Sequence, residues 1–231
     1  VGVGGGLTDA TQAAGFRPNV FDPENVESWE IGYKGTLFNG RSELNISAFS
    51  YEYEDLQVVV FDGGASAVEN VGNVESWGLE GTFRTILNEN FDLYLAASYL
   101  DTEATNLQDI CGLDNANACE GSGLFCAPDF TLAVVVNGDF PLASGASITT
   151  SLEVFYESER GGGFEGLRST KIAAFTDVTL RIGYRSIDNW SANFYIENLS
   201  NEETFDGLNN NGGILPSHFF GPKRPRAMGI S

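Results

Sequence analysis

The feature that most constrains this fold is the stretch 28–55, which contains two runs of alternating apolar and polar residues joined at Asn39-Gly40. Alternation on both sides of an Asn-Gly pair is the strongest short-range signal for a β-hairpin. Side chains alternate between the two faces of a strand. The first run therefore places Trp29, Ile31, Tyr33 and Leu37 opposite Glu30, Lys34 and Thr36. The same plan recurs three more times and predicts an array of long amphipathic hairpins.

The composition fits an all-β chain. The 231 residues include 28 glycines and 17 phenylalanines, only 19% are charged, and no window shows a sustained helical period. The 32 acidic against 12 basic residues give a net charge of -20. Such a chain repels phosphate backbones, so we expect no nucleic-acid partner. We interpret the acidity as a solvated surface rather than a specific cation site.

The alternation predicts nine strands. They lie at about 26–37, 41–55, 77–84, 91–99, 130–141, 147–156, 178–185 and 190–197, with the ninth running from about His218 to Ser231. The segment 74–77 repeats the sequence of 26–29, Val-Glu-Ser-Trp, which indicates duplicated hairpins.

The connections between these strands differ in length according to the end of the sheet. Short turns are expected at 38–41, 87–90, 142–146 and 186–189, and long loops at 56–72, 102–127, 159–171 and 199–216. All short turns thus fall at one end, which is typical of outer-membrane barrels. Aromatic residues near strand ends suit a boundary between membrane and water: Trp29, Trp77, Phe91, Tyr99, Tyr184 and Trp190.

A soluble antiparallel sandwich or barrel would alternate in the same way, with its apolar face packed inward instead of against lipid. The long strands, the one-sided loops and the large polar face favour the membrane barrel. The longest apolar run, Leu132–Val136, is strand-sized, so no transmembrane helix is expected. We predict the all-β class and an antiparallel up-and-down transmembrane β-barrel.

Several short motifs occur in a defined order along nearly the whole chain. They are Pro-Glu at 23–24 before Glu-x-Gly-x-Lys at 30–34, FSYEYEDLQ at 49–57, Asn-x-Gly at 70–72 before Gly-Leu-Glu at 78–80, Asn-Leu-Ser-Asn-Glu at 198–202, and Pro-Arg-x-x-Gly at 225–229. Together they resemble the C-terminal part of the barrel of TonB-dependent receptors of Gram-negative outer membranes.

The resemblance implies a barrel of about 22 strands filled by an N-terminal plug domain. Residues 1–231 would be about the last nine strands, a partial C-terminal barrel domain without the plug, the energy-coupling box or the final aromatic residue. The chain opens with VGVGGG instead of a methionine and a signal peptide, so we expect it to be a piece of a longer protein.

The function implied by the resemblance is energised uptake of a scarce nutrient across the outer membrane, most often a ferric siderophore, with haem, cobalamin or a saccharide as other ligands. Its partners would be outer-membrane lipid, the ferric chelate, and a TonB-type energy-coupling protein that acts through the missing N-terminal part. A passive porin-like barrel and a soluble carbohydrate-binding β domain are the alternatives. An upstream plug would argue against the first, and a need for detergent would argue against the second.

The sequence offers no credible catalytic site and no cofactor motif, so we expect no enzyme. The chain has one histidine, His218, and the glycine runs 2–6 and 161–163 lack the following helix and Lys-Ser or Lys-Thr of a phosphate cradle. Cys111, Cys119 and Cys126 match no zinc pattern. We expect an oxidising compartment and one disulfide within this loop, which leaves the pairing open and one cysteine over.

The candidate ligand contacts lie in the long loops. Arg160, Phe164 and Arg168 could meet an anionic ferric chelate. Alternatively, the acidic cysteine loop could hold a cation through Asp109, Asp114 and Glu120. The competing interpretation is that both loops are simply solvated and shaped by glycine turns.

Overall fold

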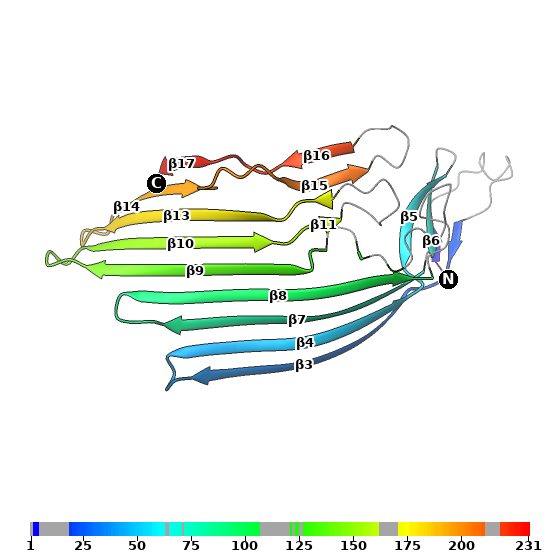
Figure 1. Cartoon of the computed structure of the whole chain (residues 1–231), viewed down its shortest axis with the longest axis horizontal. Helices are drawn as coiled ribbons and strands as arrows, with labels where there is room; N and C mark the ends of the chain where they lie inside the picture. Colours follow the sequence, from blue (N-terminus) through cyan, green and yellow to red (C-terminus); the bar gives the residue numbers. More distant parts are fainter. Residues whose placement is uncertain are drawn as a thin grey trace.

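The computed structural model describes residues 2–4, 19–62, 65–70, 72–106, 121, 123–124, 127–161, 171–210 and 218–231. Nine strands form one antiparallel sheet in the order β3-β4-β7-β8-β9-β10-β13-β14-β17 (Figure 1). Their bounds are β3 Asn25–Leu37, β4 Ser42–Glu54, β7 Asn73–Ile86, β8 Phe91–Thr105, β9 Phe130–Pro141, β10 Ser147–Glu157, β13 Phe175–Arg185, β14 Ser191–Glu197 and β17 Ala227–Ile230. The expected all-β, up-and-down architecture is confirmed. Among the described residues, no helix is long and apolar enough to cross a membrane.

The two ends of the sheet differ as the loop lengths predicted. Connections of four or five residues close one end, at the left of Figure 1, and the long connections leave the other end. Short two-stranded extensions also lie at the long-connection end. They are β1 (Gly2–Gly4) with β2 (Asn19–Phe21), β5 (Gln57–Asp62) with β6 (Ala65–Asn70), β11 (Arg160–Gly161) with β12 (Lys171–Ile172), and β15 (Phe205–Asn210) with β16 (His218–Pro222).

The first turn sets the register of β3 against β4. Phe38, Asn39 and Gly40 have φ angles of 52°, 58° and 85°, a left-handed conformation that Asn and Gly adopt at low cost. Arg41 then ties this turn to the next one, because its Nη2 donates to the carbonyl oxygens of Ile86 at 3.1 Å and Leu87 at 3.2 Å. The hairpin signal in the sequence thus corresponds to an anchored turn.

Register gives the sheet two chemically distinct faces. Directly opposite residues share a face, and one such row across six strands is Leu44, Phe83, Leu95, Val134, Val154 and Val178. The adjacent row on the other face is Asn45, Thr82, Ala96, Ala133, Phe155 and Asp177. We call these the apolar face and the polar face. The apolar face is continuous from β3 to β17.

The apolar face stays open to its surroundings. Trp29 is 73% exposed and Ile31 is 77% exposed, and large apolar side chains on β10 and β13 are also exposed, among them Leu152 and Ile182. In a soluble sandwich, a second sheet would pack on this face, but the nine strands of this sheet form a single layer. The few buried apolar residues include Val74 and Ala104, which pair directly near the long-connection end.

Aromatic pairs border the apolar face at both ends. Trp77 and Tyr99 have ring centroids 5.3 Å apart near the long connections, and Phe91 and Phe140 are also 5.3 Å apart near the short turns. Tyr184 and Trp190 lie 5.2 Å apart at the same end as Phe91. From Tyr99 to Phe91 along β8 is about 27 Å at about 3.4 Å per residue. The stretch 91–99 thus has the length of about 9–11 residues that is typical of a tilted membrane-crossing strand.

Several expectations need correction. The predicted loops 159–171 and 199–216 contain the short strands β11 and β15. The predicted ninth strand from His218 to Ser231 is two strands, because β16 pairs with β15 and β17 pairs with β14, and Pro225 between them lacks the N–H that a ladder needs. The predicted loop 56–72 contains the β5–β6 hairpin, since the run Gln57-Val-Val-Val-Phe61 favours an extended strand. The cysteine loop lies mostly outside the described residues.

A close contact at Gly78 generates a stability prediction. A Cβ at Gly78 would lie 2.5 Å from both Phe49 Cζ and the Tyr99 carbonyl oxygen, whereas a Cβ at Gly32 would meet its neighbours at 3.4 Å. Both glycines lie on the polar face. In the full-length protein we expect Gly78→Ala to lower the free energy of unfolding by about 1–3 kcal/mol through overpacking, and Gly32→Ala to leave it nearly unchanged.

The measurement is the temperature at which the folded barrel converts to the slower-migrating unfolded form on a semi-native gel. Equal conversion temperatures for the two variants would contradict the contact at Gly78.

Candidate functional site

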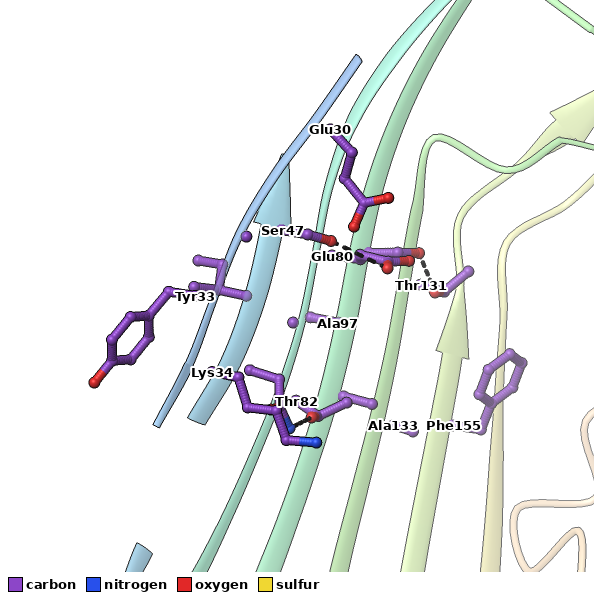
Figure 2. Close-up of a pocket in the computed structure, with 16 residues that line it drawn as sticks. Glu30, Tyr33, Lys34, Ser47, Glu80, Thr82, Ala97, Thr131, Ala133 and Phe155 are labelled. Atoms are coloured by element: carbon purple, nitrogen blue, oxygen red, sulfur yellow. Dashed lines mark hydrogen bonds between the residues drawn. The ribbon is translucent and has the colours of Figure 1, made fainter. Parts of the chain in front are cut away.

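The polar face is hollowed near its middle into a groove of about 610 Å³, the central groove (Figure 2). Its lining includes Glu30, Lys34, Ser47, Glu80, Ser98 and Thr131. Gly32, Ala96 and Ala133 also line it, and their small or absent side chains leave the space that the groove occupies. The hollow thus follows from residue size at successive polar-face positions.

Hydrogen bonds between directly opposite residues cross the central groove (Figure 2). Ser47 Oγ donates to Glu80 Oε1 at 3.1 Å, and Ser98 Oγ lies 2.7 Å from Thr131 Oγ1. Asn45 Nδ2 donates to Thr82 Oγ1 at 3.0 Å. These bonds satisfy polar atoms within the sheet. The groove presents hydroxyl, amide and charged side chains, but it has no nucleophile held by a base and an orienting residue.

A second groove of about 580 Å³ lies on the polar face toward the short turns. Asp139 and Arg181, which line it, pair with charged neighbours, and the lining residues Asn137 and Asp92 bond to each other. Arg185 Nη2 lies 2.5 Å from Asp139 Oδ2, Arg181 pairs with Glu153, and Asn137 Nδ2 donates to Asp92 Oδ2 at 3.1 Å. The strands β9, β10 and β13 thus present largely compensated charge here.

Aromatic side chains gather on the polar face toward the long connections. Along β4, the ring centroids of Phe49 and Tyr51 are 5.5 Å apart, and those of Tyr51 and Tyr53 are 6.4 Å apart. Sequence reasoning missed this set, which we call the aromatic end together with Phe155 and Phe175. The available signal was the occurrence of aromatic residues at positions where the alternation calls for polar ones.

A cation completes the aromatic end. Lys223 Nζ lies 3.5 Å from the ring centroid of Phe175 and 5.9 Å from that of Phe155, within the range of a cation–π interaction. The two rings have centroids 5.8 Å apart and belong to neighbouring strands. Lys223 thus lies over the buried ring of Phe175, next to the exposed ring of Phe155.

The predicted ligand loop is only partly described. Arg160 is buried, and its Nε lies 2.5 Å from Glu157 Oε1. Phe164 and Arg168 lie outside the described residues, as do Asp109, Asp114, Glu120 and the three cysteines. Arg160 lies at the long-connection end, in the short β11–β12 pair. Ligand contact by this loop stays a prediction.

The Asn-Leu-Ser-Asn-Glu motif forms a buried fastening at the ends of β13, β14 and β17. Asn198, with a φ of 48°, donates through Nδ2 to the carbonyl oxygens of Glu202 at 2.9 Å and Arg224 at 3.3 Å. Its Oδ1 accepts from the N–H of Glu202 at 2.9 Å. Glu202 Oε2 in turn accepts from the N–H of Thr176 at 3.0 Å. The role of this motif is thus to hold three strand ends together.

Metal binding finds no support in the part of the chain that the structure describes. There, no group of three or more His, Cys, Asp or Glu side chains is arranged to hold a metal ion.

The chain is similar to a family of known proteins in both sequence and structure. A model of the family described as "TonB dependent receptor-like, beta-barrel" matches residues 3–199. The metal-pseudopaline receptor CntO of Pseudomonas aeruginosa is 24% identical over 220 residues, which are 90% of this chain and 29% of that receptor. The chain therefore spans less than a third of the length of the curated relatives it matches.

Solved structures share the fold. The ferric yersiniabactin uptake receptor FyuA of Yersinia pestis superposes with a TM-score of 0.73 at 17% identity, over 93% of this chain and 30% of that one. BauA, the ferric preacinetobactin receptor of Acinetobacter baumannii, superposes with a TM-score of 0.64 at 18% identity, over 93% of this chain and 29% of that one. At these identities the likeness establishes the arrangement of strands.

The buried fastening at Asn198 generates a second prediction. In the full-length protein, Asn198→Ala leaves the Glu202 and Arg224 carbonyl oxygens without their donor and should lower the free energy of unfolding by about 1–3 kcal/mol. Ser200→Ala removes only a 3.5 Å contact to Asn198 Oδ1 and should change it by less than about 0.5 kcal/mol.

Thermal unfolding of the two variants measures this difference, and limited proteolysis should cut the Asn198→Ala variant first within 198–226. Equal stability and equal cutting would show that the fastening is dispensable.

Proposed function

The chain belongs to the TonB-dependent receptor-like β-barrel family, and from that premise we propose that the protein is an outer-membrane receptor for energised uptake of a metal chelate. The family consists of transporters rather than enzymes. The single observation that carries the proposal is a continuous exposed apolar face backed by a grooved polar face, in a chain of this family. Lipid meets the first face, and the second lines the path of the ligand.

The membrane placement is argued from the apolar face. Its exposed side chains run from strand to strand, and aromatic pairs mark both of its borders. The stretch 91–99 between those borders along β8 has the length of about 9–11 residues that a tilted strand uses to cross a bilayer. The long connections then face the cell exterior, and the short turns face the periplasm of a Gram-negative cell.

A ferric siderophore is the proposed ligand. The similar proteins named above are receptors for metal-pseudopaline, ferric yersiniabactin and ferric preacinetobactin, all of them metal complexes. The aromatic end offers the exposed ring of Phe155 beside Lys223 and the half-buried rings of β4, which suit the planar and anionic groups of such chelates. Arg160, Phe164 and Arg168 belong to the segment between β10 and β13 in the sequence, and we propose that they add cationic and aromatic contacts to the chelate.

The remainder of the mechanism depends on protein outside residues 1–231. We infer that a plug domain encoded elsewhere in the protein fills the barrel against the polar face, with the two grooves as contact surfaces. A TonB-type protein would act on that plug to release the ligand inward. Residues 1–231 would supply the C-terminal part of the wall.

The membrane placement predicts a sharp difference between two adjacent residues of β10. Leu152 lies on the apolar face opposite Val136 and Leu180, and Ser151 lies on the polar face opposite Asn137 and Arg181. In the full-length receptor, Leu152→Arg should cost about 2–4 kcal/mol near the bilayer midplane. Ser151→Arg should cost less, because it faces the interior, where repulsion from Arg181 opposite costs about 0.2–1 kcal/mol.

The readout is the amount of heat-modifiable, folded receptor in isolated outer membranes. A loss with Ser151→Arg and none with Leu152→Arg would reverse the assignment of the two faces.

The uptake function is tested in cells. Deletion of the full gene should abolish growth on a cognate ferric chelate under iron limitation, and a plasmid copy should restore it. A protonophore should stop accumulation of the radiolabelled chelate while leaving surface binding intact, since only transport consumes energy. Growth on inorganic iron supplied in excess is the control.

Accumulation that persists with the protonophore would favour a passive porin-like barrel. Absence of binding to any metal chelate, with binding of cobalamin or a saccharide instead, would retain the receptor but replace its ligand.

A further inference from the structure

We propose that the four short turns do not project into water but are immersed in the membrane boundary, each anchored in phospholipid by one large apolar side chain. The four residues, the apolar rim, are Phe38, Leu87, Leu142 and Ile187, which are 71%, 48%, 40% and 62% exposed. This inference rests on the proposed membrane placement and adds a specific contact surface to it.

The apolar rim is unexpected from turn chemistry. Short hairpin turns favour Gly, Asn, Asp, Ser and Pro, and each of these turns contains such residues. None of them requires a large apolar side chain, and yet every turn exposes one. Phe38 also has a φ of 52°, a left-handed conformation that costs a non-glycine residue roughly 1–2 kcal/mol. The ring of Phe38 is exposed in spite of this cost. We take this to indicate that another surface contacts the ring.

Two of the four rim residues continue the apolar face. The N–H of Leu87 donates to the carbonyl oxygen of Phe91 at 2.9 Å, and the N–H of Leu142 donates to that of Ala146 at 2.8 Å. These bonds extend the two hairpins by one pair each, so the alternation keeps Leu87 and Leu142 on the side of Phe91 and Phe140. The apolar face therefore runs past its aromatic border into the turns.

Adjacent turns also touch through the rim. Ile187 Cγ2 lies 3.2 Å from the position that a Cβ at Gly145 would occupy. Gly145 has a φ of 85° and follows Leu142 in the third turn. The fourth turn thus packs its apolar side chain against the third, which makes the rim a shared surface at these turns.

The backbone of the turns is suited to a boundary with little water. Asn88 Oδ1 accepts from the N–H groups of Asn90 at 2.9 Å and Phe91 at 3.0 Å, and Ser186 Oγ accepts from Asp188 at 3.2 Å. Side chains within the turns therefore satisfy donors that water would otherwise satisfy. The exposed carboxylates of Glu89 and Asp188 limit the depth to the headgroup and upper acyl region.

Site-directed spin labelling of the full-length receptor in phospholipid bilayers tests the rim. Each rim residue is replaced by a labelled cysteine, as in Ile187→Cys, in a background whose native cysteines are serine. Collision rates with oxygen, which concentrates in lipid, and with a water-soluble nickel complex are then compared. We expect an oxygen-to-nickel ratio several-fold higher at the rim than at Glu89→Cys and Asp188→Cys, exposed neighbours in the same turns.

The four rim positions are measured independently, and Leu152→Cys reports the apolar face itself. Nickel access at the rim equal to that of the neighbours would place the turns in water and overturn the inference. Protection from both reagents would mean that protein covers the rim, which also overturns it. If Leu152→Cys shows lipid contact and the rim does not, only this inference fails; if Leu152→Cys shows none, the membrane placement fails as well.

Discussion

Directly opposite pairing across nine strands is the constraint on which the other properties of this structure depend. A slip of one residue in a single strand would move its apolar side chains to the polar face. The observed registers avoid this from β3 to β17. Side-chain hydrogen bonds at both ends support the pairing, through Arg41 at the first two turns and Asn198 at the last strand ends. This register determines where the grooves, the aromatic end and the apolar rim lie.

The sheet gains little stability from a conventional core. Its buried apolar residues are few and lie near the ends, such as Val74, Ala104 and Phe175. Cross-strand contacts contribute roughly 0.2–1 kcal/mol each, and the large apolar area of the exposed face contributes only when something covers it. Lipid provides that cover in a transmembrane barrel, so the environment is part of the fold. The polar face can meanwhile carry Ser47, Glu80 and Arg185 in water-accessible pairs.

Sequence reasoning found what is local and periodic. The strands, the short turns and the two faces follow from alternation and turn residues, and the ordered motifs pointed to the family that the comparisons confirm. It missed contacts between residues distant in the chain, such as Lys223 over Phe175 and Asn198 bound to Arg224. Those contacts depend on inter-strand register and on the path of the long connections. Pro225, which separates β16 from β17, is visible in the sequence. The apparent continuity of the final segment nevertheless favoured a single strand.

The most direct test of the central claim is an electron cryo-microscopy map of the full-length receptor in lipid nanodiscs. We predict that β3 to β17 form adjacent strands of a closed barrel, with lipid density against Trp29, Leu79 and Leu152 and with the grooves facing the interior. A map in which protein covers those side chains, while the polar face meets the lipid or the outer solvent, would contradict the account.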